Sequence, residues 1–410
     1  MRWASSADHD RRTLLGQALA LGTALTLLGV SSSFAQSGTI RVMDYLTEGT
    51  ATVAFDNILL KTCGEKTGLT IERTSVPYAE LVQQFLLAAS TNNMPDVAYI
   101  DNSDVSQLAA AGFLTPVADI GMSLEGFVPA LQALGNYEGK DYAVPSLNNT
   151  VALYYSKPML EAAGLQPPTT WAELKDDAKK LTQGDTYGFV FPGINNEQGT
   201  FHTSPFIWSN GGNFEKMNSA EDVEALTYLR GLVEDGSVSK SVVTFAIPDA
   251  RDQFVSGRAA MMIGGSWLLP QLDEHPDLNY GVVPVPVPEG KTRGVPTGGE
   301  LWVISATANK ANAKAFLECV SAPDLMLTYA LDRNNVPSRE ALWTEFNAKL
   351  PRMAPFVESL AGARSRTAVL GTKYPKYSAA YSAAMQAILI GEKDAQTALD
   401  EAQASAEAGM

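Results

Sequence analysis

Residues 137–157 read YEGKDYAVPSLNNTVALYYSK and join two apolar segments through a polar one. The tetrapeptide at 138–141 predicts a tight hairpin turn, because glycine adopts the left-handed backbone that such turns need. Residues 142–144 predict a short strand. Residues 151–155 are apolar without alternation, which is typical of a strand buried on both faces. We therefore expect the chain to leave one lobe, cross an exposed polar gap at 146–150 and enter a second lobe, with the gap in a cleft.

Length, composition and charge limit the class of protein. The chain has 410 residues, which is enough for two domains with separate cores. It is 45% hydrophobic and 18% charged, as is ordinary for a folded soluble protein. Its formal net charge of -15 at pH 7 repels nucleic acid and anionic membrane surfaces, so we expect no nucleic-acid partner.

The first 35 residues have the pattern of a cleaved export signal. Arg11 and Arg12 precede an apolar run at 14–30, which closes on the small-x-small sequence SFA at 33–35. The paired arginines resemble a twin-arginine signal, and ordinary Sec export stays open. A membrane anchor is disfavoured, because the run is short for a span and contains glycine. We therefore predict a periplasmic protein.

Strand and helix patterns alternate after the signal. Strand patterns at 39–43, 69–74 and 95–100 are separated by helical patterns, which predicts a mainly parallel sheet. Ligands of such sheets bind at the carboxyl ends of the strands. The loops at 44–49 and 101–104 are therefore candidate binding loops.

Two further segments have the composition of crossings between lobes. Residues 254–267, FVSGRAAMMIGGSW, combine an apolar strand with Gly and Trp at a helix start, where free backbone N–H groups bind oxygen well. Residues 298–305, GGELWVIS, again place glycines before an apolar strand. We expect three crossings in all. The patterns at 374–390 and 394–407 predict a helical C-terminal part.

These segments resemble the extracellular solute-binding proteins of bacterial ABC importers, the sugar-binding family that includes the maltodextrin-binding proteins. The resemblance spans nearly all of the chain after the signal. It implies an α/β, two-lobed periplasmic-binding-protein fold of type II. The matching pieces are GKDYAVP (139–145), LYYSK (153–157), GL (164–165), PP (167–168), TWAEL (170–174), WSNGG (208–212), the stretch at 254–267 and the helix at 310–320.

The domain boundaries follow from the expected crossings. Residues 1–35 are the signal, 36–147 plus 263–305 the N-terminal lobe, and 148–262 plus 306–410 the C-terminal lobe. We expect a monomer.

Two cysteines, Cys63 and Cys319, both lie in helical patterns. Export would permit a disulfide. We expect two free buried thiols, because these boundaries place the two helices in different lobes.

Enzyme motifs are mostly absent. After the signal the chain keeps two histidines, His202 and His275, which are far apart and have no cysteine nearby, so we expect no zinc site. Residues 264–268 lack the closing glycine of a nucleophile elbow, and no GxGxxG occurs. We expect neither an enzyme nor a cofactor. A secreted glycoside hydrolase stays as an alternative, since 45 acidic residues always offer carboxylate pairs.

The resemblance implies a clamp for a hydroxyl-rich solute, a mono- or oligosaccharide or a polyol, which is delivered to the permease subunits of an ABC importer. Aromatic rings suit the CH face of a sugar, and carboxylates and amides suit its hydroxyls. The candidates are Tyr45, Trp208, Trp267 and Trp302 for stacking; Asp44, Glu48, Asp101, Asn102, Asn148, Asn149, Asn210 and Glu300 for hydroxyls; and Arg364, Arg366 and Tyr374 at the helical end of the cleft.

Some candidates and the solute itself have alternatives. Trp302 also fits a lobe core, and Asp44 also fits a cap of the first loop. A polyamine would need several converging carboxylates. A glycerol phosphate would want Arg or Lys in the cleft loops, where few occur.

Overall fold

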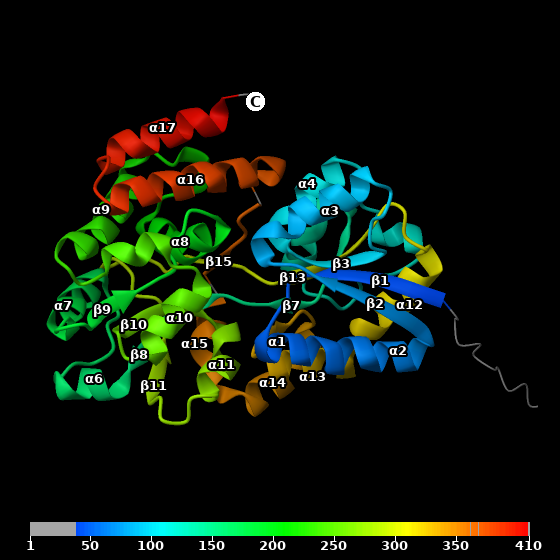
Figure 1. Cartoon of the computed structure of the whole chain (residues 1–410), viewed down its shortest axis with the longest axis horizontal. Coiled ribbons are helices and arrows are strands. Elements are labelled where there is room, and N and C mark those ends of the chain that lie inside the picture. Colours follow the sequence, from blue (N-terminus) through cyan, green and yellow to red (C-terminus); the bar gives the residue numbers. More distant parts are fainter. Residues whose placement is uncertain (1–37, 361, 368, 409–410) are drawn as a thin grey trace, which may run out of the picture. The chain divides into compact units, whose positions relative to one another are not determined.

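The structure is a computed structural model that describes residues 38–360, 362–367 and 369–408. Two β-sheets form its framework, and each is covered by its own helices (Figure 1). We call the elements around the first sheet the first lobe and those around the second sheet the second lobe. The predicted export signal lies outside the described residues. Among the described helices, none has the length and apolar composition needed to cross a bilayer.

The first sheet consists of β1 (Gly38–Asp44), β2 (Leu69–Ser75), β3 (Val97–Asp101), β6 (Ala143–Pro145) and β13 (Glu300–Ile304). Their order is β2-β1-β3-β13-β6. β1 is parallel to β2 and β3, and β13 is antiparallel to β3 and β6. Only β13 therefore runs against the others, which confirms the predicted mainly parallel sheet.

The helices of the first lobe are α1 (Gly49–Ala54), α2 (Lys61–Thr67), α3 (Leu81–Ser90), α4 (Val105–Ala110), α5 (Pro129–Gln132), α12 (Lys310–Val320) and α13 (Pro323–Arg333). A π-helical segment, η1 (Phe55–Leu60), joins α1 to α2. The short helix η2 (Tyr78–Glu80) precedes α3. Along β3, Tyr99 packs with η1 and α12 on one face of the sheet, whereas Ile100 packs with α3 and α4 on the other.

The second sheet consists of β8 (Val151–Ser156), β9 (Tyr187–Val190), β10 (Ala259–Gly265) and β11 (Tyr280–Val283), in the order β11-β8-β10-β9. β8 is antiparallel to both of its neighbours, and β10 is parallel to β9. β8 is buried from Val151 to Tyr154, and β10 is buried throughout. The predicted strand that is buried on both faces is confirmed for its first four residues, since central strands of covered sheets have no solvent-facing side.

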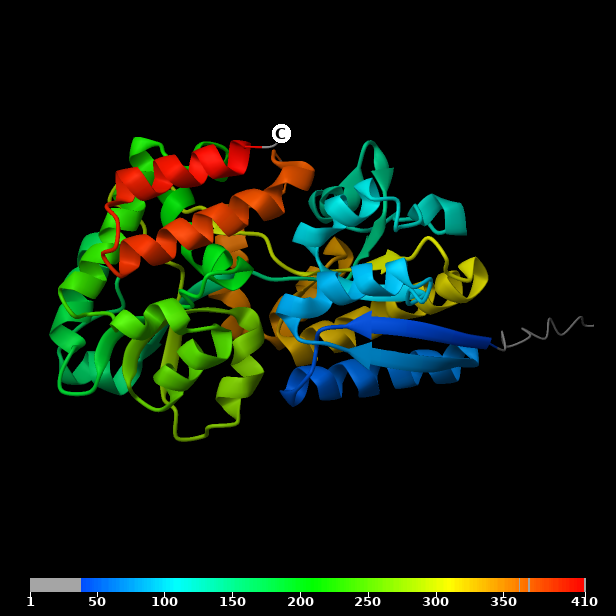
Figure 2. The same cartoon turned by 45° about the horizontal axis from the view of Figure 1, so that its top comes forward.

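The helices of the second lobe are α6 (Lys157–Ala162), α7 (Trp171–Leu181), α8 (Glu197–Asn210), α9 (Ala220–Glu234), α10 (Ile247–Val255), α15 (Ala354–Leu360), α16 (Tyr374–Leu389) and α17 (Ala395–Glu407). Two further helices, α11 (Leu269–Asp273) and α14 (Trp343–Lys349), contact the first lobe. α16 and α17 lie side by side and pack on α9 (Figure 2), so the predicted helical C-terminal part is confirmed.

The hairpin at the start of the first crossing is formed as predicted. β4 (Asn136–Tyr137) pairs with β5 (Lys140–Asp141) in an antiparallel register. The two residues between them, Glu138 and Gly139, have φ angles of 49° and 77°. Two left-handed residues in succession match the twist of a two-residue hairpin.

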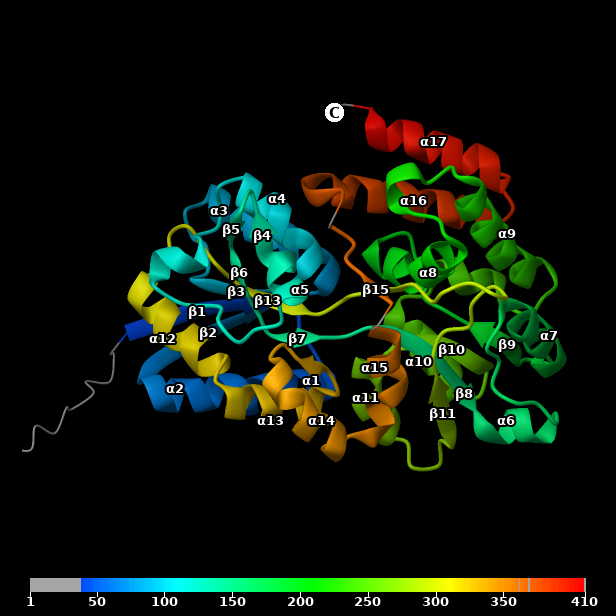
Figure 3. The same ribbon diagram turned by 180° about the vertical axis from the view of Figure 1, so that it is seen from behind.

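The first crossing runs from β6 through β7 (Leu147–Asn148) into β8 (Figure 3). β7 pairs with β14 (Val336–Pro337), and Asn149 pairs with Gly298. These pairings leave residues 146–150 between 0% and 7% exposed. The prediction of an exposed polar gap is therefore wrong, because the other crossing segments cover it.

The second crossing differs from the prediction. The strand pattern in residues 254–267 is β10, which stays inside the second sheet, and the chain returns to that sheet as β11. The chain reaches the first sheet only between β12 (Val295–Pro296) and β13. A third crossing leads from β14 to β15 (Ala363–Arg364), which pairs with β12. The predicted crossing at 254–267 is wrong, because its apolar pattern is equally that of a central strand ending at the cleft.

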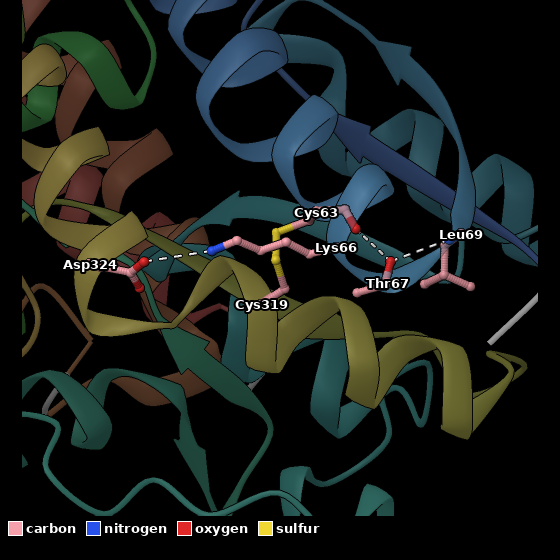
Figure 4. Close-up of a disulfide and its surroundings, with 6 residues drawn as sticks. All are labelled: Cys63, Lys66, Thr67, Leu69, Cys319 and Asp324. Carbon is pink, nitrogen blue, oxygen red and sulfur yellow. Dashed lines mark hydrogen bonds and ion pairs between the residues drawn. A yellow bond between two sulfur atoms is a disulfide. The ribbon is translucent and has the colours of Figure 1, made fainter. Parts of the chain in front are cut away.

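Cys63 and Cys319 form a disulfide (Figure 4). Cys63 lies in α2 and Cys319 in α12, and these helices pack against each other in the first lobe. Lys66 and Asp324 form an ion pair beside the bridge, at 3.6 Å. The prediction of two free thiols is wrong, because α12 packs on α2 and β1 and not in the lobe to which the sequence assigned it.

Candidate functional site

A cavity of about 250 Å³ lies where the two lobes meet. The loops after β1 and β3 and the start of β13 line it from the first lobe, because parallel strands bring their following loops to one sheet edge. α8, the start of α10 and a short helix after β10, η8 (Ser266–Leu268), line it from the second. The lining residues are Tyr45, Leu46, Thr47, Glu48, Ala51, Tyr78, Asp101, Asn149, Glu197, Gln198, Phe201, His202, Ile247, Pro248, Arg251, Trp267, Leu268, Gln271, Gly299, Glu300 and Arg333.

Two carboxylates of the first lobe, Asp101 and Glu300, are direct partners in the register of β3 and β13. The Tyr45 hydroxyl donates to Glu300 Oε1 at 2.6 Å, and the Tyr99 hydroxyl donates to Oε2 at 3.4 Å. Burial raises the pKa of Glu300, and the positive charge of Arg333 opposes that shift. The two hydroxyls hold the Glu300 carboxylate in place and leave lone pairs for further donors.

A buried arginine joins the lobes beside the cavity. Arg366 Nη2 donates to Asp101 Oδ1 of the first lobe at 2.6 Å, and Nη1 donates to Glu197 Oε1 of the second. The Arg366 side chain is 0% exposed, and its guanidinium lies over the Phe201 ring, 4.8 Å from the ring centre. Burial raises the pKa of Glu197, and Arg366 opposes that shift. Arg366 thus compensates two carboxylates that would otherwise be buried without a cation.

A second cavity of about 330 Å³ adjoins the first, and Tyr78 and Glu197 line both. The Tyr374 hydroxyl of α16 donates to Glu197 Oε1 there at 2.7 Å. Asp104 also lines it, and burial, followed by the negative charges of Asp101 and Glu197, raises the pKa of Asp104 to about 8. Asp104 is therefore mostly protonated and uncharged near neutral pH.

The second lobe contributes an aromatic wall. The Trp267 ring centre is 6.0 Å from those of Phe201 and His202, and the Trp267 and His202 rings are nearly perpendicular, at 85°. A Cβ atom on Gly265 would lie 2.0 Å from the Trp267 ring, so only glycine lets the indole fold over this backbone. Burial lowers the pKa of His202 to about 4, and the imidazole is therefore neutral at pH 7.

The arrangement suits binding by hydrogen bonds and ring stacking. It combines an apolar aromatic face with carboxylate and amide acceptors at its edge. In the part of the chain that the structure describes, no group of three or more His, Cys, Asp or Glu side chains is placed to hold a metal ion.

Six of the residues singled out from the sequence line the cavity. They are Tyr45, Glu48, Asp101, Asn149, Trp267 and Glu300. Two more, Arg366 and Tyr374, lie beside it and contact Glu197. The structure brings these eight together from both ends of the sequence.

Two candidate stacking residues lie in lobe cores instead. Trp302 is 1% exposed, with its ring centre 4.7 Å from that of Tyr99 and 5.6 Å from that of Phe55. Trp208 is 5% exposed and packs edge-on against Phe214. Trp302 thus takes the core alternative that the sequence left open, because it lies on the same face of β13 as Glu300 but two residues further from the cavity, where η1 and α12 cover it.

Asp44 and Asn102 stabilise the binding loops through hydrogen bonds outside the cavity. Asp44 accepts from Arg73 Nε at 2.6 Å and from the Leu46 backbone N–H at 2.7 Å, so it caps the loop after β1. Asn102 Nδ2 donates to the Gly299 carbonyl at 3.2 Å and ties the loop after β3 to the start of β13. Neither residue lines the cavity.

The remaining candidates lie outside the cavity lining. Asn148 is buried in β7 opposite Val336. Asn210 Nδ2 donates to the Glu221 carbonyl at 2.8 Å and thereby links α8 to α9. Arg364 is exposed in β15.

Several lining residues were missed from the sequence. Glu197 and Gln198 were missed because the sequence pattern predicts a helix only over 201–208, whereas α8 starts at Glu197, four residues earlier. Asn196, whose side chain accepts from the Gln198 backbone N–H at 2.9 Å, is an N-cap that marks the true start. Arg333 is the last residue of α13, where a basic side chain is common at any helix end, so no local pattern marks it.

Comparisons with known proteins agree with this geometry. A protein-family model described as bacterial extracellular solute-binding protein matches residues 59–351. A protein of Brucella abortus (strain 2308) described as a binding protein is 25% identical over 398 residues, covering 94% of this chain and 96% of that one. The sn-glycerol-3-phosphate-binding periplasmic protein of Rhizobium meliloti (strain 1021) is 25% identical over 362 residues, covering 79% of this chain and 83% of that one.

A solved structure has the same fold. The ABC transporter solute-binding protein of Thermotoga lettingae, bound with α-D-tagatose, superimposes with a TM-score of 0.81 at 25% identity, covering 90% of this chain and 98% of that one. The predicted two-lobed periplasmic-binding-protein fold is thereby confirmed.

Proposed function

Because the chain belongs to the family of bacterial extracellular solute-binding proteins, we propose that it captures a sugar or polyol in the cleft between its lobes and delivers it to an ABC permease. One observation carries this proposal: a single cavity joins the Trp267 and Phe201 rings to the Asp101 and Glu300 carboxylates. Sugars present a CH face to rings and hydroxyls to carboxylates. The cavity is smaller than the roughly 300–1,000 Å³ of sites for drug-sized ligands, which favours a small sugar.

The export route and the quaternary state belong to the same proposal. Residues 1–35 act as a cleaved signal of twin-arginine or Sec type and send the protein to the periplasm as a monomer without catalytic activity. We assign residues 36–147, β13, α12 and α13 to the N-terminal lobe. We assign residues 148–262 and β11 to the C-terminal lobe.

Calorimetric titration of the chain without residues 1–35 against a panel of sugars and polyols tests the proposal. We expect at least one of them to bind, and Trp267→Ala to weaken it about 10-fold to 100-fold, as loss of a buried aromatic contact implies. Trp343→Phe, in α14 outside the cavity lining, is the matched control and keeps the affinity. Failure of every sugar and polyol, with binding of a polyamine or phosphate ester instead, would contradict the proposal, and unchanged affinity of the Trp267 variant would remove that residue from the site.

A glycerol phosphate is the second candidate ligand. A relative is named for sn-glycerol-3-phosphate binding, and two arginines, Arg251 and Arg333, line the cavity although the sequence marked few basic residues in the cleft loops. Glycerol 3-phosphate therefore belongs in the titration panel. Turnover of a bound oligosaccharide would instead support the glycoside hydrolase alternative.

A further inference from the structure

Two buried side chains in the cavity wall keep polar atoms without partners. Arg333, which is 6% exposed, makes no side-chain hydrogen bond and no ion pair with any described residue, and its Nε atom is buried. His202, which is 1% exposed, likewise has a buried Nε2 atom without a partner among the described residues. Buried polar groups are normally paired, since an unmade hydrogen bond is costly and an uncompensated charge more so.

The two atoms have opposite hydrogen-bonding character. His202 Nδ1 lies 2.8 Å from the Gln198 carbonyl oxygen, which only accepts, so Nδ1 carries the proton of the neutral ring and Nε2 is left as an acceptor. The low pKa of His202 agrees with this neutral form. A guanidinium has donors only, so Arg333 requires an acceptor. A group that satisfies both kinds of site must be able to donate and accept.

The two side chains come from different lobes. His202 lies on α8, next to the Trp267 ring, whereas Arg333 ends α13 in the first lobe. Glu300 lies near enough to Arg333 for each charge to shift the pKa of the other, yet the two are not an ion pair. The acceptor of Glu300 and the donors of Arg333 therefore both remain available on one side of the cavity.

We propose that Arg333 and His202 are ligand-binding residues that hold hydroxyl groups of one bound polyol from the two lobes, and that this pair selects neutral polyhydroxyl ligands over anions. Hydroxyl groups meet both demands, because each donates one hydrogen bond and accepts others. An ionised phosphate or carboxylate group satisfies Arg333 but offers no proton to His202 Nε2. It also meets the negative charge of Glu300. The inference rests on the proposed sugar-binding function and names two of its determinants.

The test measures affinity for D-tagatose, maltose and glycerol 3-phosphate by calorimetry. We expect His202→Phe, which keeps a flat ring and removes the acceptor, to weaken sugar binding about 10-fold, and Arg333→Met to weaken it about 10-fold to 100-fold. His202→Gln, which restores an acceptor, should recover part of the loss. His275→Phe, on the exposed turn after α11, and Arg339→Met, outside the cavity lining, are the matched controls and keep the affinity.

Each outcome decides a different claim. Sugar binding of wild-type strength in His202→Phe and Arg333→Met, with the unfolding transition retained, overturns this inference and leaves the proposed function standing. No binding of any sugar or polyol by the wild type overturns the proposed function itself. Tighter binding of glycerol 3-phosphate than of any sugar overturns the selection for neutral ligands. If Arg333→Met fails to fold, Arg333→Lys replaces it, and a loss of about 10-fold is then expected because the planar fork is gone.

Discussion

The two lobes line the cleft with different kinds of side chain. The first lobe contributes the paired carboxylates of Asp101 and Glu300 at the ends of sheet strands. The second contributes the aromatic wall of Phe201 on α8 and Trp267 on η8, with the Glu197 carboxylate at the start of α8. A ligand that needs both hydrogen bonds and an apolar face gains its full contact only when both lobes touch it. Such a ligand shifts the population toward the closed arrangement in proportion to its extra contacts there.

The lobes also differ in how they are held together. The first contains the disulfide between Cys63 and Cys319, and the sequence has no other cysteine, so the second has no disulfide. The cleft itself is bridged by Arg366, whose guanidinium contacts a carboxylate from each lobe. The covalent cross-link thus lies within one lobe, whereas the Arg366 ion pairs connect the two lobes.

Breaking the junction should have the largest effect. In Arg366→Met the carboxylates of Asp101 and Glu197 lose their shared cation, and removing one partner of a buried ion pair costs about 3–5 kcal/mol. We expect a loss of that size in the free energy of unfolding, measured by urea denaturation at pH 7. Part of it should return as the pH is lowered, because the raised pKa of Glu197 favours its protonation.

The exposed neighbour at Arg364 provides the control. Arg364→Met should change the free energy of unfolding by no more than about 0.5 kcal/mol, as is usual for surface substitutions. If the two variants were equally stable, the ion bridge would contribute nothing net, and the lobes would be joined by packing only.

Removing the disulfide should have the next largest effect. The bridge closes a sequence separation of 256 residues, and loss of a native disulfide costs about 2–5 kcal/mol. We expect the Cys63→Ala, Cys319→Ala double variant to unfold at lower urea concentration and to bind its sugar with unchanged affinity, since neither cysteine lines the cavity. Lys66→Ala, which breaks the exposed ion pair beside the bridge, should cost less than about 1 kcal/mol. A double variant as stable as this control would show that packing of α2 on α12 suffices.

Replacing Asp104, at the acidic edge of the first lobe, should have the smallest effect on the free energy of unfolding, and the size of this effect should depend on pH. The pKa of Asp104 is about 8 in the folded protein against 3.8 ordinarily, so the folded state binds a proton that the unfolded state releases. Its stabilising contribution is present below about pH 4 and is lost as the pH rises through 8. The groups that act on it are Asp101, Glu197, Arg366 and Gln107.

Asp104→Asn removes this titration. We expect the variant to match the wild type near pH 4 and to exceed it by about 1–2 kcal/mol near pH 9, measured by urea unfolding across that range. This is well below what roughly 1.4 kcal/mol per pKa unit would give for a fully buried group, because Asp104 is partly exposed and solvent screens its charge. Asp119→Asn, at an exposed position, should show no such trend. A constant difference across the pH range would contradict the assignment of the raised pKa to Asp104.

Local rules predicted the local structure well. The left-handed turn at Glu138 and Gly139 depends on a few neighbouring residues and formed as predicted. The end of α2 at Gly68 and the capping box of Thr170 with Glu173 follow equally local rules. The loops after β1 and β3 were found for the same kind of reason, because strand ends in a parallel sheet share one edge.

The wrong predictions concern places where segments that are distant in the sequence contact one another. Trp302 and Trp267 each lie close to an apolar strand and to two glycines, and only their tertiary neighbours decide that one ring lies in a core and the other in the cavity. The crossing expected at 254–267 failed similarly, since a buried central strand and an interlobe strand share one apolar pattern.

The sequence alone determined the family resemblance, the parallel sheet, the hairpin and the buried strand that together make residues 137–157 a passage between lobes. Tertiary structure alone decided that this passage is covered, that Cys63 meets Cys319, and that Arg366 meets Asp101 and Glu197. The physical reason is the sequence separation over which each kind of interaction acts. Turns, caps and periodicity act over a few residues, whereas these contacts join positions 169 to 265 residues apart and form only once the folded chain has brought those distant segments together.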